Sequence, residues 1–172
     1  MFEFTENDLG EQTETHGMGE SYLLTQKSDF DLKLAEKWSQ LMKKGSFRYG
    51  LEDICSRIVG GKFGFVAQLQ LNRSTNRRPP QAMLSLKQPF TKDKFNFTLI
   101  NHEKEAIFTL QKTDEKRLGV DQLIINVSPL DHFHCLLTPQ VDLMFPQVLT
   151  EHAIIVALEV MYLSRDPQIR FI

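Results

Sequence analysis

Two histidines separated by one residue, His132 and His134, are the most obvious candidates for chemistry in this sequence. If both lie in a strand they project from one face, a spacing compatible with metal binding. Zinc takes about four ligands, however, and only Asp131 and Cys135 are close in sequence. Adjacent strand residues point to opposite faces, so Cys135 and His134 would diverge rather than form a nucleophile and its base. The pattern therefore favours neither a metal site nor a thiol nucleophile.

Basic side chains form a second candidate group, in the segment NRSTNRRPPQ at residues 72–81. Arg73, Arg77 and Arg78 lie there beside two prolines. Arginine suits phosphate because its planar guanidinium donates paired hydrogen bonds and stays charged. A solvated surface loop would have the same composition, and spacing alone favours that simpler interpretation.

The third candidate is Asn126, which interrupts an apolar run just before Ser128 and Pro129. Its amide could bind a ligand or cap a turn, and the chemistry of the segment favours the turn. Residues 121–139 read as two short strands around that turn, so we expect them to pair as antiparallel neighbours.

Two helices are predicted to flank these strands. The first begins after Ser28, with Asp29 and Asp31 in its first turn, and ends at Gly45. The second begins after Thr150. Their apolar residues recur at helical spacing. These residues are Phe30, Leu34, Trp38, Leu41 and Met42 in the first helix, and Ile154, Ile155, Leu158, Met161 and Tyr162 in the second.

Several further strands are predicted between the helices. Alternation over residues 63–71 places Phe63, Phe65, Ala67, Leu69 and Leu71 on one face, which we expect to cover a core. Short apolar runs at residues 83–90, 95–100 and 105–111 continue the pattern, and residues 168–172 resemble the start of another strand. The expected fold class is α+β, an antiparallel sheet with flanking helices.

Composition sets the outer limits on function. The 172 residues are 41% hydrophobic and 24% charged with a net charge of −2, a profile typical of one globular domain. Neither a basic excess for nucleic acid nor a run long enough to span a bilayer is present. Residues 1–27 are predicted to form a flexible arm. Two distant cysteines favour a reducing, cytoplasmic location.

Three blocks in order resemble a known family: FGFVAQLQLNRSTNRRPPQ, QPFTKDKFNFTLI and INVSPLDHFHCLLTP. They are similar to the GDP-D-glucose phosphorylases, relatives of plant GDP-L-galactose phosphorylase in the histidine-triad superfamily. The resemblance implies a nucleotidyltransferase that converts GDP-hexose and inorganic phosphate into hexose 1-phosphate and GDP. The reaction would pass through a guanylyl-histidine intermediate and would need no cofactor or metal.

The same resemblance implies a nucleotide site. Asn126 matches the residue that binds the ribose hydroxyls, Phe97 and Ile100 match residues that pack around the base, and Val127 would lie on the other side of the base. Arg78, with its neighbouring arginines, matches a basic block of the phosphorylase branch. His134 matches a histidine in a structural Gly-His strand, where Phe133 replaces the glycine.

The catalytic His-x-His-x-His motif of the family is not found in this sequence. Residues 28–172 are therefore expected to be the N-terminal part of a histidine-triad-like nucleotidyltransferase domain, incomplete at its C-terminus and inactive alone. The alternative is a catalytically inactive guanine-nucleotide-binding or interaction protein on the same scaffold. An unpaired sheet edge would also favour an oligomer.

Overall fold

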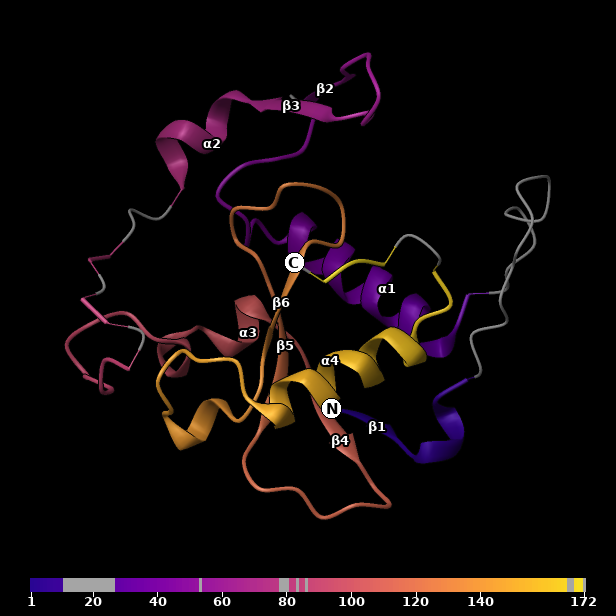
Figure 1. The fold of residues 1–172 in the computed structure, drawn as a ribbon, viewed down its shortest axis with the longest axis vertical. Helices are drawn as coiled ribbons and strands as arrows, with labels where there is room; N and C mark the ends of the chain where they lie inside the picture. The colour runs from indigo at the N-terminus through magenta and orange to yellow at the C-terminus, as the bar shows by residue number, and fades with distance from the viewer. Residues whose placement is uncertain are drawn as a thin grey trace.

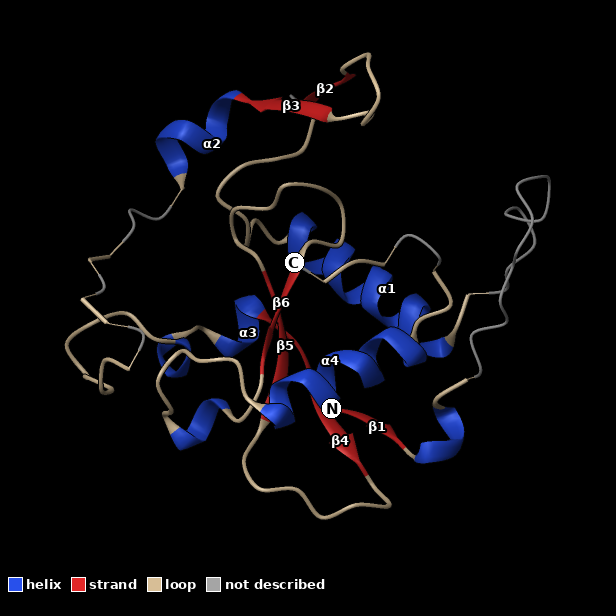
Figure 2. Cartoon of the chain, in the orientation of Figure 1, coloured by secondary structure: helices blue, strands red, loops and turns tan. Residues whose placement is uncertain are grey.

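The chain folds into an α+β structure in which a mainly antiparallel sheet is flanked by helices, as predicted (Figure 1). A four-stranded sheet has the order β1-β4-β5-β6, and a separate sheet pairs β2 with β3 (Figure 2). Two long helices, α1 (Asp29–Lys43) and α4 (Glu151–Leu163), pack against the four-stranded sheet. This computed structural model describes residues 1–10, 27–52, 54–77, 81–82, 84–85, 87–166 and 169–171.

Helix α1 begins where the sequence predicts. The Ser28 side chain accepts a hydrogen bond from the Asp31 N–H, and the Asp31 carboxylate accepts one from the Ser28 N–H, both at 3.1 Å. The helix ends before Gly45, whose φ of +71° suits glycine. The predicted apolar face is also confirmed, because Phe30, Trp38 and Leu41 are buried and Leu34 and Met42 pack against them.

The carboxylate of Asp31 also joins the two long helices. It accepts hydrogen bonds from the Ser164 hydroxyl at 2.6 Å and from the Arg165 N–H at 2.9 Å. Ser164 directly follows the last residue of α4, and both Asp31 and Ser164 are buried. One buried acceptor therefore fixes the end of α4 against the beginning of α1.

Strands β4 (Ala106–Lys112), β5 (Asp121–Ile125) and β6 (Cys135–Thr138) form an antiparallel meander. The predicted pairing within residues 121–139 is confirmed, with Leu123 opposite Leu137. All five residues of β5 are buried. Leu123 and Ile125 pack in the core with the helices, so Ile124 faces the opposite side of the sheet.

Strand β1 (Phe2–Phe4) differs from the flexible arm expected over residues 1–27. It pairs in parallel with β4, and both of its phenylalanines are buried. The Phe2 ring lies 5.3 Å from the rings of Phe30 and Phe108. Local periodicity cannot reveal a three-residue strand whose partner is distant in sequence. Most of the remaining arm, residues 11–26, lies outside the described residues.

Strands β2 (Ile54–Ile58) and β3 (Val66–Gln70) form an antiparallel hairpin away from the four-stranded sheet (Figure 1). The prediction that the alternating face of residues 63–71 covers a core is wrong in this structure. Phe63 is 73% exposed and Leu69 is 58% exposed. Alternation shows which side chains share a face, but it does not supply a second layer to cover that face.

Helix α4 also begins as predicted, because the Thr150 hydroxyl accepts a hydrogen bond from the Ala153 N–H at 3.1 Å. The packed face is not the predicted one. The buried residues are Val156, Glu159, Val160 and Leu163, whereas the predicted residues Ile154, Ile155, Leu158 and Tyr162 are exposed. When a helix is apolar on nearly every side, the spacing of its apolar residues does not predict which face is buried.

Short helices replace other predicted segments. Part of the predicted arginine loop forms α2 (Leu71–Asn76). The run before residue 101 contains the 3₁₀ helix η3 (Phe97–Leu99), followed by α3 (His102–Glu105), rather than a strand. The described residues of 83–90 and 169–171 form no strand. Two more 3₁₀ helices are η1 (Glu6–Asp8) and η4 (Val141–Leu143).

Strand β6 lies at an edge of the four-stranded sheet, and no described strand pairs with its outer side. Association through an open edge therefore stays a prediction, which light scattering can test. Within the described ranges, no helix is long and apolar enough to cross a bilayer.

Candidate functional site

A pocket of about 270 Å³ lies at the end of β5, beside Ile124 and its β6 partner Leu136. These two residues face away from the helical core. The lining combines an apolar wall with a few polar groups, the usual composition of a small-molecule site. The apolar members are Phe95, Phe97, Ile124, Ile125, Val127 and Leu136, and the polar members are Arg73, Arg77, Glu105, Asn126 and Ser128.

The pocket brings together three of the five residues that the family resemblance assigns to a nucleotide site, and two of the three candidate arginines, Arg73 and Arg77. Asn126 and Val127 line it from the turn after β5, and Phe97 lines it from η3. Phe95 extends the aromatic wall, since its ring meets that of Phe97 edge to face at 5.7 Å. Ile100 is buried after η3 but does not line the pocket. Arg78 lies outside the described residues.

The amide of Asn126 caps the turn, as its sequence context predicts. Its Oδ1 accepts a hydrogen bond from the Ser128 N–H at 3.0 Å, and its backbone N–H donates to the His134 carbonyl at 3.1 Å. A carbonyl oxygen has two lone pairs, so Oδ1 can still accept a second donor. Capping the turn and binding a ligand are therefore compatible roles for this side chain.

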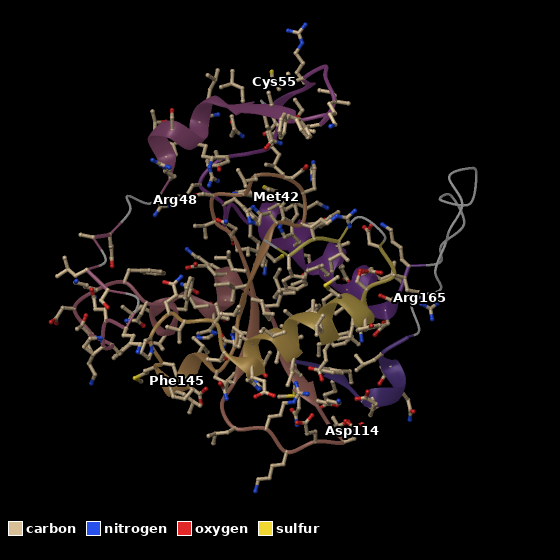
Figure 3. The ribbon with its side chains drawn as sticks, in the orientation of Figure 1. Met42, Arg48, Cys55, Asp114, Phe145 and Arg165 are labelled. Carbon is tan, nitrogen blue, oxygen red and sulfur yellow. The ribbon has the colours of Figure 1, made fainter. Side chains whose placement is uncertain are left out.

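Arg73 fixes the same turn from the outside. Its guanidinium donates to the Ser128 carbonyl and, at 3.1 Å, to the Tyr49 hydroxyl, which in turn donates to the Pro129 carbonyl at 2.9 Å. Arg48, which Figure 3 labels, adds a second connection between α2 and the turn. Its guanidinium donates to the Asn76 carbonyl at 2.9 Å, and its N–H donates to the Val127 carbonyl at 2.9 Å.

Arg77 is different, because it lines the pocket, is exposed, and forms no ion pair with any described residue. Its guanidinium is therefore available to an anion, whereas that of Arg73 is occupied by the turn. Ser128 adds a further polar group. Its hydroxyl is buried and has no hydrogen-bond partner among the described residues.

The paired histidines have separate structural contacts. The Nδ1 atom of His134 accepts a hydrogen bond from the Leu130 N–H at 3.0 Å. The His132 ring packs 5.7 Å from Trp38, and the Phe133 ring meets Trp38 at 5.4 Å. Phe133 has a φ of +61°, a conformation that favours glycine. Phe133 thus occupies a backbone conformation that suits the glycine expected from the resemblance.

Burial lowers the pKa of His134, and the positive charge of Arg73 lowers it further, against a raising effect of Asp131. The unfolded chain therefore takes up a proton more readily than the folded chain. The unfolding free energy should fall as the pH drops below about 6.5 towards the lowered pKa, and this contribution should be flat above that range.

Replacing His134 with glutamine should reduce that pH dependence. Urea unfolding at pH 7.5 and 5.5 measures it, and the variant should lose less stability on acidification than the parent chain. His102→Gln, at an exposed position in α3, is the matched control and should behave like the parent. An unchanged pH dependence in His134→Gln would contradict this account.

The remaining reactive candidates are poorly placed. Burial raises the pKa of the Cys135 thiol to about 12, so it stays protonated near neutral pH. Cys55 is exposed on the distant hairpin (Figure 3). In the part of the chain that the structure describes, no three His, Cys, Asp or Glu side chains cluster in a way that could hold a metal ion.

Sequence reasoning missed five pocket residues, namely Phe95, Glu105, Ile124, Ile125 and Leu136. Phe95 gave a signal, because it lies two residues before Phe97 in an alternating run. Glu105 gave no signal, since a single acidic residue at the start of an apolar run resembles the ordinary exposed end of a strand.

The chain is similar in sequence to several known proteins. The chain is 44% identical to GDP-D-glucose phosphorylase 1 of Danio rerio over 84% of its length, covering 41% of that protein. It is 38% identical to the Homo sapiens protein of the same name over 84% of its length, covering 38%. It is 30% identical to GDP-L-galactose phosphorylase 2 of Arabidopsis thaliana over 78% of its length, covering 35%. No solved structure matches the chain.

The chain thus spans about two fifths of the length of these curated relatives, or less. A family described as "GDPGP1-like, N-terminal domain" matches residues 29–172, which include both long helices and every residue that lines the pocket. The chain therefore belongs to the GDPGP1-like family, through the N-terminal domain of that family.

Proposed function

We propose that this chain provides the guanine-nucleotide site of a GDP-hexose phosphorylase. The observation that carries the proposal is the pocket itself, in which Asn126, Val127 and Phe97 converge from two segments that are separate in sequence. The choice of ligand comes from the names of the relatives, which are phosphorylases of GDP-D-glucose and GDP-L-galactose.

Each part of a guanine nucleotide has a suitable neighbour in this pocket. The base lies between the aromatic wall and Val127, where apolar burial and stacking stabilise it. Asn126 binds the ribose hydroxyls, and Arg77 contacts a phosphate. A volume of about 270 Å³ is near the lower end for ligand sites, and it suits a nucleoside better than a whole nucleotide sugar.

In the complete reaction, an imidazole nitrogen attacks the phosphorus attached to guanosine and releases hexose 1-phosphate. Inorganic phosphate then displaces the histidine from the guanylyl group and forms GDP. These 172 residues contain no His-x-His-x-His motif, and none of the described histidines lines the pocket. The chain alone therefore binds the nucleotide without forming the covalent intermediate. With its two free cysteines, we place it in the cytoplasm.

The second candidate function is a nucleotide-binding or interaction protein without catalysis. It is supported by the same observation, that no histidine in the described part of the chain lines the pocket. Two measurements test both functions. Calorimetry should detect saturable binding of GDP, and the absence of binding at millimolar GDP would contradict the nucleotide site. Incubation with GDP-glucose labelled in the guanylyl phosphate should leave no acid-labile label on the protein. A labelled histidine would show that this chain does carry a nucleophile.

A further inference from the structure

We propose that Glu105 selects guanine over adenine, by accepting hydrogen bonds from the N1–H and N2–H groups of the base. The inference rests on the proposed nucleotide site and adds the residue that reads the base. Glu105 is the only carboxylate among the described residues that line the pocket.

The position of Glu105 is set by the sheet. It is the last residue of α3 and directly precedes Ala106, the first residue of β4. Ala106 is paired with Ile124 in the neighbouring strand. Glu105 therefore lies next to the part of β5 that forms the pocket floor, beside the apolar wall in which the base is placed.

The carboxylate is held in place and still has capacity to bind. One oxygen accepts a hydrogen bond from the Asn101 N–H at 3.2 Å, which restricts the side chain. No described lysine, arginine or histidine forms an ion pair with Glu105, although Arg77 lines the same pocket. A carboxylate offers about four lone-pair positions, so two further N–H donors can be accommodated.

The charge of Glu105 restricts what it can face. A carboxylate repels a phosphate, so Glu105 is unsuited to the phosphate end of a nucleotide. Guanine presents N1–H and N2–H side by side, and these two donors match the two oxygens of a carboxylate. Adenine presents an amino donor beside a ring nitrogen that only accepts, and that lone pair would oppose the carboxylate. Recognition by Glu105 therefore excludes adenine.

The Glu105→Gln variant tests this inference in the 172-residue chain. Glutamine keeps an oxygen to accept the Asn101 N–H, so the start of α3 is retained. Its amide offers one acceptor and one donor, which match adenine better than guanine. We expect the affinity for GDP to fall by about tenfold or more, while the affinity for ADP stays the same or rises.

Three nucleotides separate the outcomes when binding is measured by calorimetry. The parent chain should prefer GDP, then IDP, which lacks the N2 amino group, and then ADP. Glu103→Gln removes the same charge from an exposed position in the same helix and should change none of these affinities. Circular dichroism of each variant checks that the fold is intact.

Each other result overturns the inference. If Glu105→Gln keeps the preference of the parent for GDP, Glu105 does not read the base, and the proposed nucleotide site stands. If the variant weakens GDP, IDP and ADP equally, Glu105 supports the pocket without selecting the base. If the parent chain binds none of the three nucleotides, the proposed function fails together with this inference.

Discussion

Replacing Asn126 with alanine should lower the affinity of the chain for GDP by about tenfold to a hundredfold, the loss expected for one or two hydrogen bonds to a ligand. The Asn126 amide lies in the pocket at the end of β5, with an Oδ1 lone pair beyond the one used by Ser128. Alanine leaves the ribose hydroxyls without that partner. Calorimetric titration with GDP measures the difference.

Asn126→Asp is the matched control for this variant. Aspartate keeps an oxygen that can accept both the Ser128 N–H and a ribose hydroxyl, so GDP affinity should remain within a few-fold of the parent. Because alanine also removes the hydrogen bond that caps the turn, urea unfolding must accompany the titration. A stably folded Asn126→Ala chain with undiminished GDP affinity would refute the ribose assignment.

Replacing Arg117 with methionine should lower the free energy of unfolding by about 3 kcal/mol, because the buried carboxylate of Glu159 loses its main partner. Both oxygens of Glu159 accept hydrogen bonds from the Arg117 guanidinium at 2.6 Å. Glu159 is buried on the packed face of α4, and only Lys112, at 3.3 Å, would remain to pair with it. The same contacts, led by the hydrogen bonds to Glu159, raise the pKa of Arg117.

Two controls show whether burial is the cause. Glu115 pairs with the same arginine at 2.7 Å but its side chain is 51% exposed, so Glu115→Gln should change stability by less than about 1 kcal/mol. The double variant Arg117→Met with Glu159→Leu removes both buried charges and should recover most of the loss. Equal losses in Arg117→Met and Glu115→Gln, measured by urea unfolding, would contradict this explanation.

Local sequence predicted the elements whose causes are local. Ser28 and Asp31 start α1 through contacts three residues apart, and Thr150 starts α4 in a similar way. The antiparallel pairing of β5 with β6 followed from two apolar runs joined by a short polar turn. The cap of Asn126 on the Ser128 N–H was likewise visible from neighbouring residue types.

Packing decided the features that depend on distant partners. The N-terminal strand is parallel to β4 because Phe2 finds a core made by residues far along the chain. The buried face of α4 includes Glu159, whose partner Arg117 lies far away in sequence, and periodicity could not detect that contact. The hairpin of β2 and β3 has the alternation of a buried strand, yet it is exposed because no other described element covers it.

The candidate site shows the same division. The sequence identified Asn126, Val127 and Phe97 through the family resemblance, and the chemistry of the turn through residue types. The fold alone brought Glu105 and the arginines of α2 and its end to that turn. The position of these residues around one pocket depends on the register of the strands. It also depends on the hydrogen bonds from Arg73 to Ser128 and Tyr49, which connect residues far apart in sequence. Sequence spacing encodes neighbours along one element, whereas a pocket is formed between elements.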